Sequence, residues 1–192
     1  AEYMTKPLST DSVIGSTCYA VFGSATGAEN SAWVVYYNRT LLDKAGYDSM
    51  EKLAASEEWT LGKLREIAET VAAETMDKRS PDSSHDIFGY SSYYNDDEFL
   101  LSLWQTSGVR AFGDSPGQPL ELRYDYEKAQ SALDTLGAFL DSKAMFPASG
   151  QSALNAFGEG RLAFFIYRLD FASVLAEQDV DWGLLPLPAL SA

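Results

Sequence analysis

The side chains that most often perform catalysis are scarce in this sequence. The 192 residues include one histidine, His85, and one cysteine, Cys18, which cannot together supply the ligands of a typical zinc site. A serine–histidine–aspartate mechanism would need His85 as its base, but this residue falls in the polar stretch SPDSSHDI, where we predict an exposed loop. The sequence has no G-x-S-x-G elbow, phosphate loop or dinucleotide-binding fingerprint. It therefore predicts no metal site, no cofactor and no nucleophilic catalysis.

Paired carboxylates leave one enzymatic alternative open, because a glycoside hydrolase needs only two of them. The least ordinary carboxylate is Asp170, which follows an apolar run and an arginine. Its candidate partners are Glu159 and Asp97. Asp97 belongs to the acidic run 96–98 at the predicted start of a helix, where carboxylates stabilise the helix dipole. A small acidic glycoside hydrolase thus stays an alternative function.

Two aromatic groups stand at the predicted ends of strands. The first follows the run 86–92 and consists of Tyr90, Tyr93 and Tyr94. The second follows the run 162–167 and consists of Tyr167, Arg168, Asp170 and Phe171. Ligands of open α/β sheets bind outside the carboxyl ends of strands. Aromatic rings beside charged groups suit a polyhydroxylated ligand, because the rings stack on its C–H faces and the charged groups bond its hydroxyls.

The composition limits the other possibilities. The net charge is −14, with 28 acidic and 14 basic residues, so nucleic acid and anionic membrane surfaces are poor partners. Hydrophobic residues make up 46% of the chain, enough for a sizeable packed core. No apolar run approaches the length of a membrane span. A single cysteine excludes an internal disulfide but does not identify the compartment.

The order of apolar runs and turn signals predicts a mixed α/β fold with more helix than strand. We predict strands over 17–22, 33–37, 86–92, 120–123, 162–167 and 181–187. We predict helices over 39–45, 48–55, 60–71, 96–106, 125–142, 152–157 and 169–178. Residues 1–16 read as a tail or linker and 17–192 as one α/β lobe.

Local signals fix several helix ends. Asn38, Asp48, Thr60 and Asn95 are predicted N-caps, and Gly46 is a predicted left-handed stop. The core stripe of the helix over 125–142 is predicted to consist of Ala129, Ala132, Leu133, Leu136, Phe139 and Leu140.

Six segments, taken in order, resemble the family 1 extracellular solute-binding proteins, the sugar-capturing components of bacterial ABC importers. The segments are YYNRTLLDKAGYD, EEWTLGKLREIAETVAA, DIFGYSS, LWQTSGV, AFGEGRLAFFIY and DWGLLPLP. Each motif alone is weak, but together they extend from Cys18 to Pro188 in the order and spacing of that family.

The resemblance implies one lobe of a type II periplasmic-binding-protein clamshell, with the first lobe and the C-terminal helices of such proteins absent from this sequence. It implies non-catalytic capture of a solute, most simply a mono- or oligosaccharide, by a monomer that delivers it to a membrane permease. It also implies a periplasmic or cell-surface lipoprotein. A helical protein-interaction domain, marked by a large exposed apolar face, stays a further alternative.

Ligand contacts in that family often follow two strands of this lobe. Carried over by position, they fall on Tyr93, Tyr94 and Asn95 after one strand, and on Arg168 and Asp170 after the other. We add Tyr90 from the aromatic pattern, and we expect Glu29 and Asn30 to reach the cleft from a longer loop. The family commonly has glycine and then tryptophan where this sequence has Arg168 and Asp170, which points to a different ligand or an altered geometry.

Overall fold

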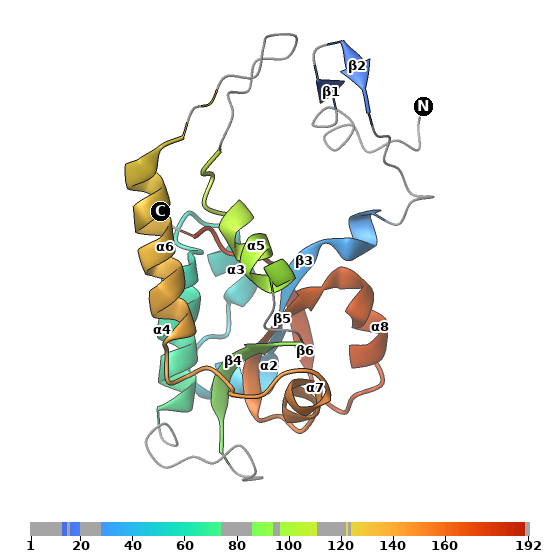
Figure 1. The fold of residues 1–192 in the computed structure, drawn as a ribbon. Helices are drawn as coiled ribbons and strands as arrows, with labels where there is room; N and C mark the ends of the chain where they lie inside the picture. The colour runs from blue at the N-terminus through green and yellow to red at the C-terminus, as the bar shows by residue number, and fades with distance from the viewer. Residues whose placement is uncertain are drawn as a thin grey trace.

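The structure is a computed structural model that describes residues 13–14, 16–19, 28–73, 86–93, 97–110, 122 and 124–190. A four-stranded mixed sheet lies at its centre, in the order β4–β5–β3–β6 (Figure 1). Its strands are β3 (Trp33–Asn38), β4 (Phe88–Ser92), β5 (Leu162–Arg168) and β6 (Trp182–Pro186). β4 and β5 run parallel, whereas β3 runs antiparallel to both β5 and β6. A separate two-residue pair joins β1 (Val13–Ile14) to β2 (Thr17–Cys18).

Helices cover both faces of the sheet, which gives three layers (Figure 1). One core cluster draws its side chains from α2 (Arg39–Lys44), α3 (Met50–Ala54), α4 (Leu61–Ala72), α5 (Asp97–Gln105) and α6 (Tyr126–Leu140). The other cluster joins the sheet to α7 (Gln151–Gly158) and α8 (Ala172–Leu175). Two 3-10 helices, η2 (Ala28–Ser31) and η3 (Leu169–Phe171), complete the described elements. The predicted mixed α/β fold is confirmed.

The position of β3 in the middle of the sheet explains why its residues are apolar or aromatic on both faces. It lies between β5 and β6, and Val35 and Tyr37 join one core cluster while Val34 and Tyr36 join the other. The chain then turns directly into α2, as predicted. The Asn38 side chain accepts a hydrogen bond from the Leu41 N–H at 3.1 Å.

The two other capping signals in this region behave differently. Thr60 caps α4 as predicted, because its Oγ1 accepts from the Lys63 N–H at 3.2 Å. Asp48 does not cap the next helix. Ser49 is the N-cap of α3, and its hydroxyl donates to Asp48 Oδ1 at 3.0 Å instead of serving the helix. Gly46, with φ of +87°, adopts the predicted left-handed stop.

Two predicted elements need correction. The strand over 17–22 ends at Cys18, and residues 20–22 lie outside the described part. The strand predicted over 120–123 stays a prediction, because of its residues only Leu122 is described. In place of one helix over 169–178, the chain forms η3 and then the short α8. The Ala172 N–H donates to the Leu169 carbonyl three residues earlier, so the first turn is 3-10 rather than α-helical.

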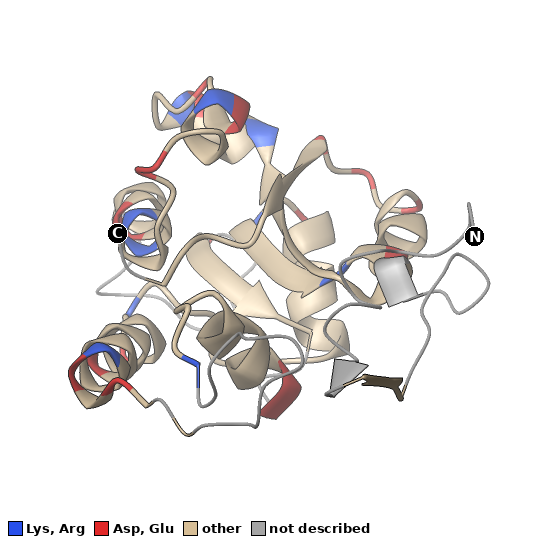
Figure 2. Ribbon diagram, turned by 90° about the horizontal axis from the view of Figure 1, so that it is seen from above, with Lys and Arg blue, Asp and Glu red and all other residues tan. Residues whose placement is uncertain are grey.

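The core stripe of α6 also needs one correction. Ala129, Ala132, Leu136 and Phe139 are buried as predicted, but Leu133 is 51% exposed. Charged residues lie mainly on the helices and connections around the sheet (Figure 2). Arg168 is the one charged residue within the four strands of the sheet.

Candidate functional site

The parallel pairing of β4 and β5 brings Tyr93, from the first predicted aromatic group, to the same edge of the sheet as the second group. Ser92 is the register partner of Ile166, so the chain leaves both strands at neighbouring positions. Tyr93 follows β4 directly, and its ring centroid lies 5.3 Å from that of Tyr167, near the end of β5. The ends of these two strands, which the sequence analysis considered separately, therefore lie side by side.

Four rings form what we call the strand-end cluster: Trp33, Tyr93, Tyr167 and Phe171. Phe171 lies 5.0 Å from both Tyr93 and Tyr167, and Trp33 meets Tyr167 edge-on at 5.3 Å, measured between ring centroids. Tyr167 is buried, while the other three rings are partly exposed. The cluster therefore presents aromatic surface to solvent on a packed base.

Sequence reasoning missed Trp33, although it named the strand that begins there. β3 is antiparallel to β5, so its first residue, Trp33, is paired with Arg168 at the far end of β5. The start of β3 thus shares an edge with the ends of β4 and β5. Without the strand direction, the only available signal was a tryptophan at the junction of a loop and a strand.

Arg168 and Asp170 lie beside these rings and form an ion pair. Arg168 Nε is 3.5 Å from Asp170 Oδ1, and their side chains are 37% and 41% exposed. The Arg168 guanidinium carbon lies 5.4 Å from the centre of the Tyr167 ring, close enough for a cation–π contact. The edge therefore offers a donor fork, an acceptor and aromatic faces within one small area.

The backbone under this ion pair is fixed by Tyr36. Its hydroxyl lies 2.9 Å from the Arg168 carbonyl and 3.1 Å from the Leu169 carbonyl, and donates toward both. Burial, with a further contribution from the nearby charge of Asp170, raises the pKa of Tyr36 well above its usual range. This hydroxyl therefore stays protonated and holds the junction between β5 and η3. A bond from the Leu169 N–H to the Ala32 carbonyl at 2.8 Å ties the same junction to the chain before β3.

Two buried side-chain atoms of the described residues have no hydrogen-bond partner, and both lie at this edge. They are Ser92 Oγ, at the end of β4, and Arg168 Nε, at the end of β5. Buried polar atoms are nearly always bonded, so an unbonded pair at one place points to groups that a ligand or water completes.

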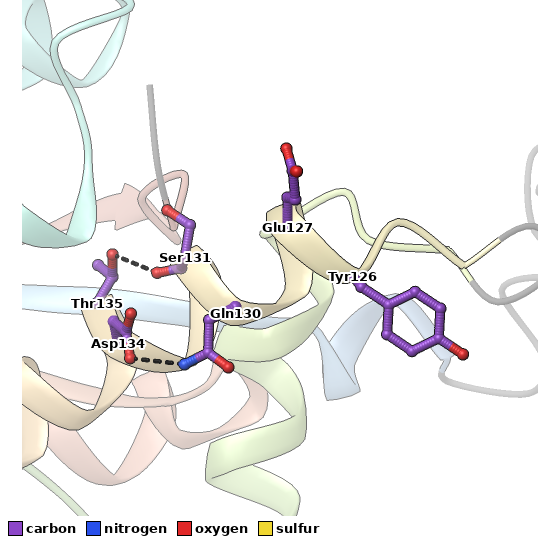
Figure 3. A pocket seen from close by; sticks show the side chains of 6 residues that line it. All are labelled: Tyr126, Glu127, Gln130, Ser131, Asp134 and Thr135. Carbon is purple, nitrogen blue, oxygen red and sulfur yellow. Dashed lines mark hydrogen bonds between the residues drawn. The ribbon is translucent and has the colours of Figure 1, made fainter.

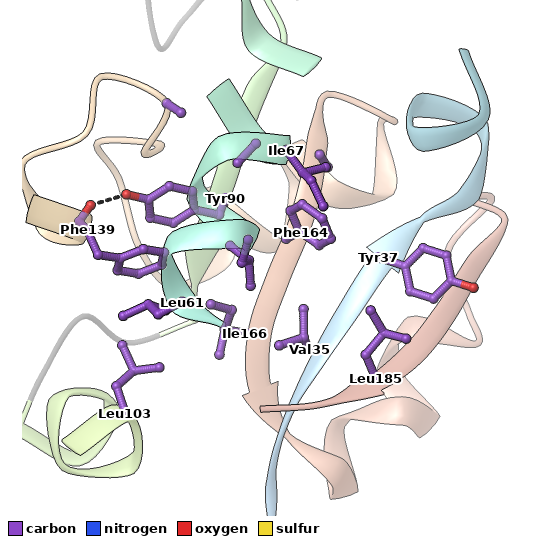
Figure 4. Close-up of a cluster of buried hydrophobic side chains, with 14 of the residues drawn as sticks. Val35, Tyr37, Leu61, Ile67, Tyr90, Leu103, Phe139, Phe164, Ile166 and Leu185 are labelled. Carbon is purple, nitrogen blue, oxygen red and sulfur yellow. Dashed lines mark hydrogen bonds between the residues drawn. The ribbon is translucent and has the colours of Figure 1, made fainter. Parts of the chain in front are cut away.

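The structure corrects the placement of Tyr90. Its side chain is 0% exposed, its ring stacks on Phe139 with centroids 4.1 Å apart, and its hydroxyl donates to the Phe139 carbonyl (Figure 4). Tyr90 is thus a core residue and is not available to a ligand. The reason is the alternation of strands, because residues three apart in an extended chain point to opposite faces.

The remaining predicted contacts have different outcomes. Tyr94, Asn95 and Glu29 lie outside the residues whose side chains the structure describes. Asn30 is exposed on η2, which packs against η3. The sequence prediction for these four residues therefore stays a prediction.

The carboxylate pair of the hydrolase alternative is not assembled from Asp170 and Glu159. Glu159 precedes β5 and pairs with Arg161 at 2.8 Å, whereas Asp170 follows β5. The seven residues of strand between them correspond to roughly 20 Å, well beyond the ~5–9.5 Å that glycosidases use. Among the residues described, no three His, Cys, Asp or Glu side chains gather as a metal site would need.

A shallow pocket lies on α6, away from the strand-end cluster (Figure 3). Its lining consists of Tyr126, Glu127, Gln130, Ser131, Asp134 and Thr135. All six residues come from one helix, and Gln130 already bonds Asp134 at 2.9 Å. Solute sites are built from polar groups that converge from several elements, so the strand-end cluster is the better candidate.

The family is decided by a match along almost the whole chain. The family model described as bacterial extracellular solute-binding protein matches residues 10–192. The chain belongs to this family. A comparison with curated proteins finds no match.

Membership agrees with the architecture, since a mixed α/β sheet covered on both faces is what one lobe of a solute-binding protein contains. The family consists of extracellular binding proteins rather than enzymes, which supports solute binding outside the cytoplasm as the role of this solute-binding protein. Among the described helices, none combines the length and the apolar character needed to cross a membrane.

Proposed function

We propose that this solute-binding protein captures a carbohydrate at the strand-end cluster and delivers it to the permease of an ABC importer. The observation that carries the proposal is the convergence of three partly exposed rings with Arg168 and Asp170 at one sheet edge. A sugar needs this combination, because its C–H faces stack on rings while its hydroxyls need both donors and acceptors.

In this proposal Tyr93 and Trp33 supply stacking surface, and Arg168 and Asp170 supply hydrogen bonds. Tyr94 and Asn95 are further proposed contacts on the sequence alone. The solute bridges this lobe and a second one, and closure follows as a shift of population toward the state in which both lobes contact it. We further propose a monomer that works as a periplasmic protein or a cell-surface lipoprotein.

Calorimetry with a panel of mono- and oligosaccharides tests the proposal, using the natural full-length protein. Tyr93→Ala and Trp33→Ala are each expected to weaken binding of the accepted sugar at least tenfold, ~1.4 kcal/mol. Tyr126→Ala is the matched control, because Tyr126 is 75% exposed on α6 and lines the pocket on that helix rather than the strand-end cluster. It should leave binding unchanged.

The proposal fails if no sugar binds, or if the loss is the same in all three variants. Circular dichroism and thermal melting of each variant separate a lost contact from a lost fold. Equal melting temperatures with unequal affinities would assign the loss to the site.

A further inference from the structure

The guanidinium of Arg168 is a set of hydrogen-bond donors for which the described residues supply no hydrogen-bond acceptor. It has five N–H groups and cannot be deprotonated in a protein. Within the described residues none of them makes a hydrogen bond, and Nε is buried without one. Asp170 is close enough to form an ion pair, but at 3.5 Å from Nε it is not bonded to it.

This guanidinium is also held in place before any ligand arrives. The Tyr167 ring lies under it, and Tyr36 fixes the carbonyl of the same residue from below. A side chain that is already positioned loses less conformational entropy when it binds. Arg168 is thus a pre-organised donor fork at the edge where the solute is proposed to bind.

The acceptor that fits such a fork is a carboxylate. A planar guanidinium donates two parallel N–H bonds to the two oxygens of a carboxylate, and each such charge-assisted bond is about twice as strong as a bond between neutral groups. A single hydroxyl can use only one of those donors well. Arg168 is moreover the one charged residue in the four strands of the sheet. The strand residues that surround its guanidinium are therefore uncharged.

From this geometry we infer that the solute is an acidic saccharide whose carboxylate takes Arg168 away from Asp170. The inference rests on the proposed carbohydrate function and adds the class of sugar. Asp170 is then the resident partner that neutralises Arg168 in the free protein and must be displaced. The net charge of −14 repels an anionic sugar only weakly. Salt screens the repulsion from charges that lie farther from the sugar than a Debye length of about 8 Å.

The test compares acidic and neutral sugars of the same stereochemistry. The probes are D-galacturonate against D-galactose, D-glucuronate against D-glucose, and their short oligomers, measured by calorimetry at one fixed salt concentration. The readout is the ratio of affinities within each pair, which does not depend on how much of a sample is folded. The wild type is expected to bind one acidic sugar at least tenfold more tightly than its neutral counterpart.

Substitutions of Arg168 and of Asp170 are expected to change the binding of the acidic sugar in opposite directions. Arg168→Gln keeps hydrogen-bond donors but removes the charge and the fork, and should bring the ratio close to one. Asp170→Asn removes the competing carboxylate at nearly constant shape, and should raise affinity for the acidic sugar several-fold. Arg168→Lys keeps the charge without the fork, and should give an intermediate ratio.

The inference is overturned if the neutral sugar binds as tightly as the acidic one, or if Asp170→Asn weakens binding of the acidic sugar. In either case sugar binding stands and the pair serves neutral hydroxyls. If no sugar of either kind binds the wild type, the proposed carbohydrate function itself is wrong, and this inference falls with it.

Discussion

Replacing Tyr36 with phenylalanine tests whether the backbone under the site is held by one buried hydroxyl. Tyr36 is 0% exposed, and its hydroxyl donates toward the carbonyls of Arg168 and Leu169 at 2.9 and 3.1 Å. Phenylalanine keeps the ring and its packing against Phe165 and Trp182. The substitution therefore removes the hydrogen bond and little else.

The size of the effect follows from the partial burial of the two hydrogen bonds. A typical hydrogen bond contributes about 0.5–1.5 kcal/mol net, and leaving a buried acceptor unpaired costs about 1–3 kcal/mol. Because the two carbonyls share one donor, we expect Tyr36→Phe to lower the free energy of unfolding by about 1–2 kcal/mol. For a chain of this length, that is a fall in melting temperature of roughly 2–8 °C.

The next residue in the strand provides a matched control. The hydroxyl of Tyr37 bonds Glu51, whose side chain is 60% exposed, so water can replace the lost bond. Tyr37→Phe should therefore lower the free energy of unfolding by less than about 1 kcal/mol. Urea denaturation followed by circular dichroism measures both variants. Equal losses in the two variants, or no loss in Tyr36→Phe, would refute the reasoning.

The same residue predicts a dependence on alkaline pH. Burial raises the pKa values of Tyr36 and Tyr90 above their ordinary value of 10.0, so above pH 10 the unfolded chain releases protons that the folded chain retains. The free energy of unfolding therefore has its full value below pH 10. It falls as the pH rises toward the pKa values that the two tyrosines have in the folded protein. The slope is about 1.4 kcal/mol per pH unit for each tyrosine. Tyr36→Phe should make this slope shallower by the contribution of one tyrosine, about 1.4 kcal/mol per pH unit. An unchanged slope would contradict the raised pKa of Tyr36.

Further predictions concern packing and capping. Gly89→Ala should destabilise by about 1–3 kcal/mol, because the added Cβ would lie 2.6 Å from the Cβ of Ala68. Gly137→Ala, in α6 with no atom within 4 Å of the new Cβ, should stabilise by about 0.5–1 kcal/mol. Thermal melting of the two variants should therefore show shifts of opposite sign. Asn38→Ala removes the bond to the Leu41 N–H and should lower the free energy of unfolding by about 1 kcal/mol. A urea midpoint unchanged from the wild type would show that another group caps α2.

The sequence predicted the elements whose causes are local. β3 and β5 are almost entirely apolar or aromatic runs, and all four strands of the sheet were placed to within a few residues. Asn38 and Thr60 were identified as caps because a cap is decided by residues three positions apart. Long-range contacts decided the misses. The helix expected over 169–178 is shortened where the Leu169 N–H and carbonyl bond Ala32 and Tyr36, far away in the sequence.

The candidate site was predictable in part for the same reason. Tyr93 follows β4 directly, Arg168 ends β5 and Asp170 lies in the turn after it, so locating the strands was enough to select these residues. Their meeting at one edge depends on the parallel pairing of β4 with β5. Trp33 needed the direction of β3, which no local pattern gives. Tyr90 was assigned to the site by its nearness in sequence to Tyr93, and strand alternation, applied to the same residues, would have separated them.

In the proposed site, the preference for an acidic over a neutral sugar depends on the difference between two interactions of Arg168. One is its bond to the carboxylate of the sugar, and the other is its ion pair with Asp170. Because Asp170 already neutralises Arg168 in the free protein, a neutral sugar meets no uncompensated charge there. An acidic sugar must displace Asp170, so its advantage is the bidentate bond to the guanidinium minus the weaker ion pair that it replaces. The absence of a hydrogen bond between Arg168 Nε and Asp170 keeps the subtracted part small. In the proposed site, Arg168 would discriminate acidic from neutral sugars, and Asp170 would set the extent of that discrimination.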